Sequence, residues 1–362
     1  MDGSIITITP EIARAAVYGG AFLGGGGGGS VETGLITALE ALKLGDIKIV
    51  PLDCIADDAS VITASAVGAP AAQEGYVTAE HCKRAMELFQ DFFHQEIKGV
   101  ITNENGGHST TNGWVLSAIT GIPVIDAPCN GRAHPTGQMG SMGLSMDPSY
   151  VSCQVAVGGK EETGKYLEMA VRGRLDAASR LVRRAAVEAG GLVTVLRNCV
   201  KAGYLRKNAA PGALKQAIKV GEIFLNNEGD YIKILQGLSR LMPLEVISEG
   251  TVRDFKLETR DGFDVGKMMI NEIEVTFWNE YMTVEKEGER LATFPDLIVT
   301  LDLETGKVKT SAQVAKGDKL ALIKVPKHAL ILGKGMYDQQ LFVEVERIIN
   351  KQMVDYHFSQ GD

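Results

Sequence analysis

The sequence predicts a mixed α/β protein with a largely parallel sheet flanked by helices, followed by a smaller antiparallel β domain, a barrel or a sandwich. Up to about residue 243, short runs of β-branched residues alternate with helix-like segments, as in sheets covered by helices. From there to about residue 325, β-branched and charged residues alternate along the chain, which is typical of antiparallel strands. We therefore expect an α/β domain over 1–243 and a β-rich domain over 244–325. We also expect the tail, 326–362, to pack back on the α/β domain.

The α/β domain is predicted to begin with two helices. Thr9 and Pro10 form a helix start, and Ser30 can cap a second helix that runs to Leu44. Six glycines, Gly24–Gly29, join the two helices. Further strands are expected at 47–52, 60–67, 99–102, 122–125, 150–157 and 191–196. Further helices are expected at 78–96, 160–190, 211–224 and 231–242, and residues 342–350 could be helix or strand.

The glycine run allows three interpretations: a flexible linker, a tight structural passage, or a backbone cradle for an anion or polar ligand at a helix N-terminus. In the third interpretation, the substrate-binding residues are Gly26, Gly27, Gly28 and Ser30. No strand precedes the run in a GxGxxG pattern and no Gly-Lys-Ser/Thr follows it, so a nucleotide site has little support.

Composition excludes several classes of partner. The net charge of −8 and the pI near 5.4 disfavour nucleic acid and anionic membranes, which need a basic surface. No apolar run is long enough to cross a bilayer, and the N-terminus has no secretory signal pattern. Five scattered cysteines do not suggest a disulfide framework, so we expect a cytoplasmic protein.

The candidate site is the stretch 98–142, a predicted strand–helix–strand unit. Reactive side chains follow both strands, at the edge where open α/β sheets bind ligands. The first loop carries Glu104, Gly106, Gly107 and His108, and the second carries Asp126, Cys129, Arg132 and His134.

His108, Cys129 and His134 are the predicted metal ligands, because three protein ligands and an open position are the layout of a catalytic zinc site. Two alternatives stay open. Cys129 could instead be a nucleophile with His108 or His134 as its base, or the three could be structural.

Carboxylates and one arginine complete the predicted site. Glu104 and Asp126 could each act as base, metal ligand or orienting group, and with Cys129 they are the predicted catalytic residues. Gly106 and Gly107 are expected to contact the substrate. Arg132 could clamp a substrate carboxylate or form a structural salt bridge.

The sequence also resembles the S-methyl-thiohydantoin desulfurase-like family over nearly its whole length. The matching motifs are Leu23–Ser30, Gly68-Ala69-Pro70 with Glu74, Glu104 with Gly106-Gly107, Pro123 with Asp126, Gly131-Arg132-Ala133 with Pro135, Phe277–Met282, and Pro295–Ile298. The chain departs from the family pattern at His108, Pro128, Asn130 and His134, so the added Cys and His residues fall where the pattern is broken.

The resemblance implies an enzyme that removes sulfur from a thiohydantoin ring, for example the thiohydantoin propionate of ergothioneine breakdown. We expect hydrolysis of the C=S group, with zinc or a similar divalent metal polarising the sulfur. A hydantoin ring amidohydrolase and a non-catalytic partner subunit of a hydantoinase are the alternatives. The expected partners are a small heterocyclic substrate and further copies of the chain in a homo-oligomer.

Overall fold

The computed structural model describes residues 3–68, 74–260 and 262–358. Its first two helices begin at the predicted capping residues. Thr9 Oγ1 accepts a hydrogen bond from the backbone of α1 (Pro10–Gly24), and Ser30 Oγ accepts one from the backbone of α2 (Val31–Leu44). The turn predicted at Gly68-Ala69-Pro70 lies outside the described residues except for Gly68.

The first sheet has eight strands in the order β1-β2-β5-β4-β3-β8-β6-β7. Their bounds are β1 Ile6–Thr7, β2 Lys48–Pro51, β3 Ser60–Gly68, β4 Gly99–Thr102, β5 Val124–Asp126, β6 Val151–Gly158, β7 Leu167–Arg174 and β8 Leu192–Lys201. The four strands β2, β5, β4 and β3 are parallel neighbours. The flanking pairs are antiparallel, so the sheet is mixed as predicted but parallel only in this part.

Helices follow the strands of this sheet, and all but the last of them cover it. The last packs against the helix before it and against strands of the second sheet. The helices are α3 Ala79–Phe93, α4 Trp114–Thr120, α5 Leu175–Glu188, α6 Ala202–Asn208, α7 Ala213–Asn226 and α8 Tyr231–Leu241, with short 3₁₀ turns η1 Leu52–Cys54, η2 Ser109–Thr111, η3 Met139–Ser141, η4 Leu144–Met146 and η5 Glu161–Thr163. The single helix predicted over 160–190 is wrong. Its first half is strand β7, which pairs with β6 over eight residues, and only its second half is helical.

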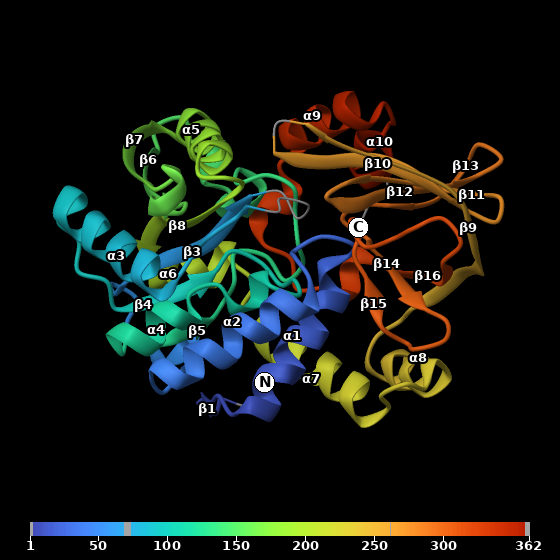
Figure 1. Ribbon diagram of the computed structural model, residues 1–362, viewed down its shortest axis with the longest axis horizontal. Coiled ribbons are helices and arrows are strands. Elements are labelled where there is room, and N and C mark those ends of the chain that lie inside the picture. The colour runs from blue at the N-terminus through green and yellow to red at the C-terminus, as the bar shows by residue number, and fades with distance from the viewer. Residues whose placement is uncertain (1–2, 69–73, 261, 359–362) are drawn as a thin grey trace.

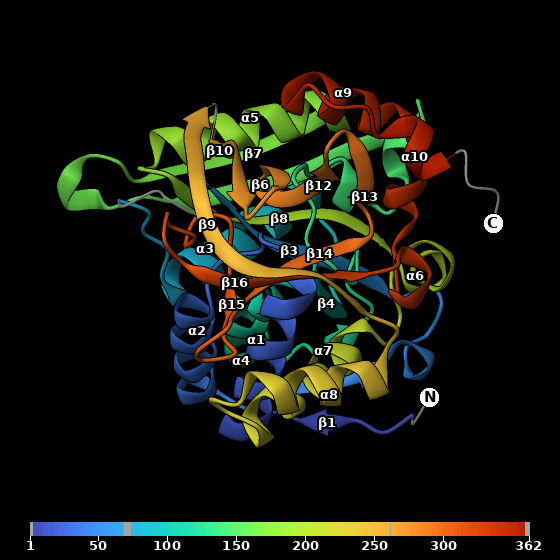
Figure 2. The same cartoon turned by 90° about the vertical axis from the view of Figure 1, so that its right-hand side faces the viewer.

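The second sheet is antiparallel throughout, in the order β13-β12-β11-β10-β9-β16-β14-β15. Its strands are β9 Glu245–Arg260, β10 Phe263–Ile270, β11 Ile273–Trp278, β12 Glu280–Lys286, β13 Glu289–Thr293, β14 Leu297–Asp302, β15 Val308–Lys309 and β16 Lys319–Val325. The long strand β9 pairs with β10 along one half and with β16 along the other. Figure 2 shows it running across the whole face of this sheet.

The two sheets form two units that lie side by side, with α1 reaching towards β14 and β15 (Figure 1). After β16 come η6 Lys327–Ala329, η7 Lys334–Tyr337, α9 Gln339–Ile349 and α10 Val354–Phe358. The tail contacts both units. The N–H of Gly131 in the first unit donates to the carbonyl oxygen of Ile331, and Ser145 Oγ donates to Asp338 Oδ2, whereas α9 packs on the second unit. Phe342 and Met353 share a cluster with Trp278 and Phe294, and Met139 is the residue of the first unit in it.

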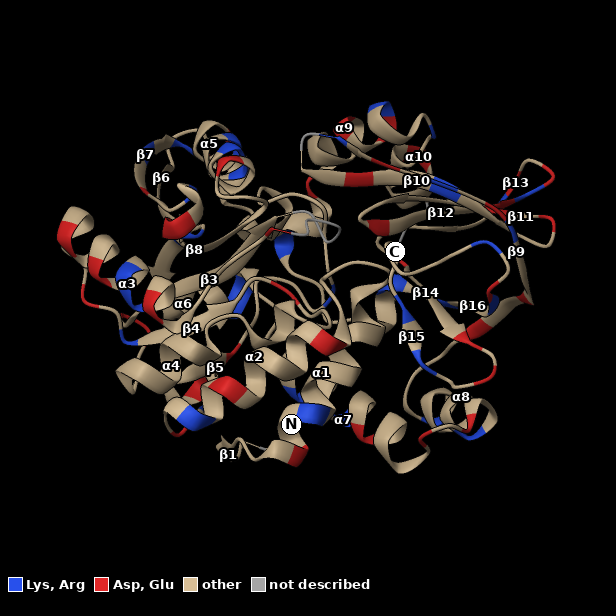
Figure 3. Cartoon of the chain, viewed as in Figure 1, with Lys and Arg blue, Asp and Glu red and all other residues tan. Residues whose placement is uncertain are grey.

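Close helix contact brings the glycine run into position. A Cβ at Gly19 of α1 would lie 1.7 Å from the carbonyl oxygen of Ala217 in α7, so only glycine allows this approach. Charges of both signs are interspersed over the helices and outer strands (Figure 3). Within the described part of the chain, no helix is long and apolar enough to cross a membrane.

Candidate active site

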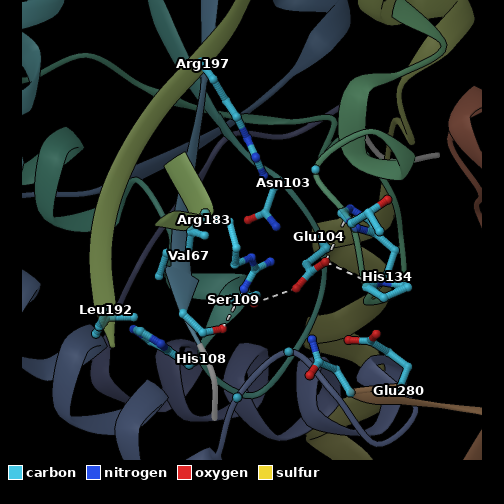
Figure 4. Close-up of a pocket in the computed structure, with 18 residues that line it drawn as sticks. Val67, Asn103, Glu104, His108, Ser109, His134, Arg183, Leu192, Arg197 and Glu280 are labelled. Atoms are coloured by element: carbon cyan, nitrogen blue, oxygen red, sulfur yellow. Dashed lines mark hydrogen bonds and ion pairs between the residues drawn. The ribbon is translucent and has the colours of Figure 1, made fainter. Parts of the chain in front are cut away.

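The candidate site is a cavity at the carboxyl ends of β3 and β4, where the β11–β12 connection faces the first unit (Figure 4). Its volume is about 120 Å³. The glycine run, α5, β8 and the loops after β4 and β5 supply the rest of its wall. The lining residues are Gly28, Gly29, Ala66, Val67, Gly68, Asn103, Glu104, His108, Ser109, His134, Pro135, Thr136, Gly137, Arg183, Leu192, Arg197, Asn279 and Glu280.

Glu104 is a buried carboxylate held by two donors. Ser109 Oγ donates to Glu104 Oε1 at 2.8 Å, and the backbone N–H of His134 donates to Oε2 at 3.1 Å. Only 6% of its surface is exposed. These two contacts fix the position of the carboxylate in the cavity wall. Figure 4 shows both contacts converging on it.

Two histidines line the cavity, and burial favours the neutral form of each. Burial lowers the pKa of His108 to about 4. It also lowers the pKa of His134, although the charge of Glu104 acts in the opposite direction. His134 Nε2 lies 3.3 Å from Glu104 Oε2, but neither ring nitrogen of His134 has a hydrogen-bond partner among the described residues.

A second carboxyl group, that of Glu280, faces the same cavity from the start of β12. It is 2% exposed, and its Oε2 has no hydrogen-bond partner among the described residues. Burial and the nearby charge of Glu104 raise its pKa well above the usual value, while Arg132 and Arg183 oppose this. The cavity therefore holds two carboxyl groups in very different surroundings.

Two arginines supply positive charge. Arg183 donates to the carbonyl oxygens of Gly68 and Gly262 and stacks over the ring of Phe263, with 4.1 Å from Cζ to the ring centroid. Arg197 is 4% exposed, and its Nε has no partner among the described residues. Burial lowers the pKa of both guanidinium groups, but an arginine remains charged in a protein.

The structure brings four of the predicted residues to this cavity. Glu104, His108, His134 and Gly28 all line it. They come from the loop after β4, the loop after β5 and the glycine run, as the strand-end argument requires. The remaining predicted residues lie elsewhere.

Asp126 and Cys129 face away from the cavity. Asp126 Oδ1 accepts a hydrogen bond from the backbone N–H of Leu214 at 2.9 Å, so this carboxylate caps the start of α7. Cys129 is fully buried in an apolar cluster with its Sγ 3.3 Å from Thr63 Oγ1, and burial raises its pKa to about 11. A thiol with that pKa is a poor nucleophile near neutral pH.

Arg132 joins the two units instead of facing the cavity. Its Nη1 donates to the carbonyl oxygens of Pro295 at 3.0 Å and Asp296 at 2.6 Å, and its Cζ lies 4.4 Å from the centroid of the Phe294 ring. Its side chain is fully buried. The predicted roles of Arg132 were a clamp for a substrate carboxylate or a structural salt bridge. In the structure its hydrogen-bond acceptors are backbone carbonyls instead.

Most of the glycine run is a tight passage between the two units. A Cβ at Gly26 would meet the Tyr281 ring at 2.7 Å, and Gly27 is blocked by Glu280. Gly28 Cα lies against Gly106, and its carbonyl oxygen accepts hydrogen bonds from the N–H groups of His108 and Ser109.

The other small residues predicted to bind substrate have structural contacts. Ser30 caps α2, and Gly107 packs on the backbone of Gly29 and Ser30. Gly26, Gly27, Ser30, Gly106 and Gly107 therefore do not line the cavity.

The predicted metal ligands do not form one set. Among the described residues, no group of three or more His, Cys, Asp or Glu side chains could hold a metal ion. His108 and His134 line the cavity, whereas Cys129 does not. Its Sγ forms a hydrogen bond with Thr63 Oγ1. The donor set present here does not fit the three-ligand zinc site that the sequence suggested.

Sequence reasoning missed Arg183, Arg197, Asn279 and Glu280. The last two belong to the FWNEYM motif, Phe277–Met282, which the resemblance had already singled out without a role. The two arginines lie in α5 and β8, and no local pattern marks them, because β8 reaches the site only through its antiparallel pairing with β3.

Comparison with known structures and families agrees with this architecture. A crystal structure of a protein from Chromobacterium violaceum is 19% identical, has a TM-score of 0.72, and covers 94% of this chain and 97% of its own, which shows a shared fold. No curated protein matches the chain.

Two family models match most of the sequence. The S-Me-THD-like N-terminal domain matches residues 13–163, and the S-Me-THD-like C-terminal domain matches residues 174–336. The first region supplies Glu104 and His134, and the second supplies Arg183, Arg197 and Glu280, so the cavity is built from both. The chain therefore belongs to the S-Me-THD-like family.

Proposed function

We propose that this protein hydrolyses the thioxo group of a thiohydantoin-type ring, giving the hydantoin and sulfide. Family membership supports the substrate class. The observation that carries the reaction type is the Glu104 carboxylate, which is buried in the cavity wall and held by Ser109 and the His134 N–H. A buried, fixed carboxylate is suited to take a proton from an attacking water.

The cavity favours a small ligand with a polar edge. Its volume of about 120 Å³ is far below the ~300–1,000 Å³ of pockets for drug-sized ligands. Its wall carries Asn103, Glu104 and Arg197, which can bind ring N–H groups and a developing negative charge. A single five-membered ring with amide and thioxo groups matches this chemistry.

In the proposed reaction, Glu104 accepts a proton as a water oxygen bonds to the thioxo carbon. The C=S π electrons move to sulfur, and the Arg197 guanidinium stabilises the resulting charge. His134 orients Glu104 through its backbone N–H. The C–S bond then breaks and sulfur leaves as sulfide with the electron pair of that bond. The hydroxyl on the carbon loses its remaining proton and becomes the carbonyl.

The test is to incubate the purified protein with thiohydantoin and with its propionate derivative, and to measure sulfide and ring products separately. We expect sulfide and intact hydantoin, and a decrease in kcat of about 100-fold or more in Glu104→Gln. Glu188→Gln, which changes an exposed partner of Arg184, is the matched control and should retain activity.

Other outcomes separate the alternatives. Ring-opened product without sulfide would make the protein an amidohydrolase. If no thiohydantoin reacts and the protein co-purifies with a ring-opening enzyme, it is a non-catalytic partner subunit. In either case the desulfurase proposal is wrong.

A further inference from the structure

We propose that Glu280 is a neutral carboxylic acid that donates its proton into the cavity, where it protonates the leaving sulfur. The role of the proton rests on the hydrolysis proposed above. The protonation state of Glu280 does not rest on it, because it follows from the surroundings of the side chain. Glu280 and Glu104 would then divide the acid and base roles between them.

The two carboxyl groups differ in their hydrogen-bond partners. Both oxygens of Glu104 accept hydrogen bonds, one from Ser109 Oγ and one from the His134 N–H. Oε2 of Glu280 is buried and has no donor within the described residues. When a buried carboxyl oxygen has no donor, the anionic form of the group is costly in free energy. In the neutral form the oxygen can carry the proton and act as a donor itself.

The surrounding charges act on Glu280 in both directions, and burial is the largest influence on its pKa. The charged groups that act on it are Glu104, Arg132 and Arg183. Glu104 lies across the same cavity and disfavours a second negative charge. Arg132 and Arg183 favour the anion, but in the described part of the chain neither forms an ion pair with Glu280. Both donate to backbone carbonyls instead, those of Ala133, Pro295, Asp296, Gly68 and Gly262.

The two histidines of the wall do not supply a compensating charge. Burial favours neutral His108 and neutral His134. Arg197 is charged and interacts with Glu104. The backbone of Gly27 packs directly against the carboxyl group of Glu280, since a Cβ on Gly27 would lie 1.9 Å from Glu280 Oε1.

The proton balance is complete without a further reactant. Glu104 takes one proton from water as the C–O bond forms, and Glu280 gives its proton to the thiolate sulfur. When the C–S bond breaks, the pair of electrons leaves with HS⁻, and the new hydroxyl returns its proton to Glu280 as the carbonyl forms. HS⁻ then takes the proton held by Glu104, so the sum is C=S plus water giving C=O plus H₂S.

The direct test is infrared spectroscopy of the whole protein with hydrogen–deuterium exchange, which detects the C=O stretch of a protonated carboxyl group. We expect this band in the wild type at neutral pH and its loss in Glu280→Gln. In Glu104→Gln the band should persist and titrate at lower pH, since the opposing charge is gone. Glu188→Gln should leave it unchanged.

Two results would overturn the proposal. One is the absence of a Glu280-dependent band from the wild type at neutral pH. The other is a band that Glu104→Gln removes over the whole pH range in which the protein is folded, because the proton would then reside on Glu104. A wild type that shows the Glu280 band but releases no sulfide would refute only the proposed reaction.

Kinetics give a second measurement. Glu280→Gln should bind hydantoin, the product, with unchanged affinity, while kcat for sulfide release decreases by roughly 10²–10⁴-fold. The wild-type rate should decrease at high pH as Glu280 loses its proton, and this decrease should be absent from the residual activity of Glu280→Gln. The same high-pH decrease in both proteins would exclude Glu280 as the acid.

Discussion

Gly27 and Glu280 are in direct contact across the boundary between the two units: a Cβ built on Gly27 lies 1.9 Å from Glu280 Oε1 and 2.5 Å from its Cδ. The glycine run thus fixes the position of a cavity carboxyl group from behind. This contact gives Gly27 a function that does not depend on contact with substrate.

Replacing Gly27 with alanine should displace Glu280. The extra methyl group overlaps the carboxyl group, and overpacking of this kind costs about 1–3 kcal/mol. We expect lower stability in urea unfolding and a strong loss of sulfide release. The double variant Gly27→Ala/Glu280→Ala should regain stability but not activity, because the space is restored and the acid is not.

Gly173→Ala is the matched control, because nothing lies within 4 Å of a Cβ built there. Its stability should change by no more than about 0.5 kcal/mol. Full activity in Gly27→Ala would contradict the fixed position of Glu280.

Arg132 is expected to affect stability rather than substrate affinity. Its guanidinium donates to the carbonyls of Ala133, Pro295 and Asp296 in a fully buried position. Arg132→Met would leave these acceptors without donors and should lower the free energy of unfolding by about 2–5 kcal/mol. The KM of the folded fraction should stay close to the wild-type value. An increased KM with an unchanged urea midpoint would restore the predicted substrate clamp.

Cys129 should be inert to alkylation in the folded protein. Its thiol is fully buried and its pKa is raised to about 11, so almost no thiolate is present near neutral pH. Mass spectrometry after brief treatment with iodoacetamide should find Cys54, which is exposed, labelled and Cys129 unlabelled. Cys129→Ala should retain sulfide release. Inactivation that parallels labelling of Cys129 would support the nucleophile instead.

The sequence predicted Glu104 and His134 because polar residues after neighbouring parallel strands meet at one sheet edge. The same rule placed Asp126 and Cys129 there, and for them it fails. Asp126 turns to the start of α7 and Cys129 turns to Thr63, and the direction of a loop side chain depends on packing that the local sequence does not specify. Strand pairing brings Arg197 to the cavity, and the contact of the two units brings Glu280 there. Neither kind of contact leaves a pattern in the local sequence.

The sequence predicted the parts of the fold that depend on local interactions and missed parts that depend on non-local pairing. Capping residues marked α1 and α2 correctly, since a cap is a local interaction. Strand β7 was missed because its sequence, LEMAVRGR, has the composition of a helix, and it is a strand only through its pairing with β6. Non-local pairing overrode local propensity there.

His108 should make the protein less stable in acid. Burial lowers its folded-state pKa from 6.5 to about 4, so between these pH values the unfolded chain binds a proton that the folded protein does not. The free energy of unfolding should therefore decrease as the pH decreases from 6.5 to about 4, by about 3 kcal/mol from this residue, and it should be unaffected by His108 at higher pH. Urea unfolding at a series of pH values measures this. His108→Gln should flatten the curve over that interval, whereas His328→Gln, at an exposed position, should not. Equal slopes in wild type and His108→Gln would mean that His108 titrates normally and is not enclosed in the cavity wall.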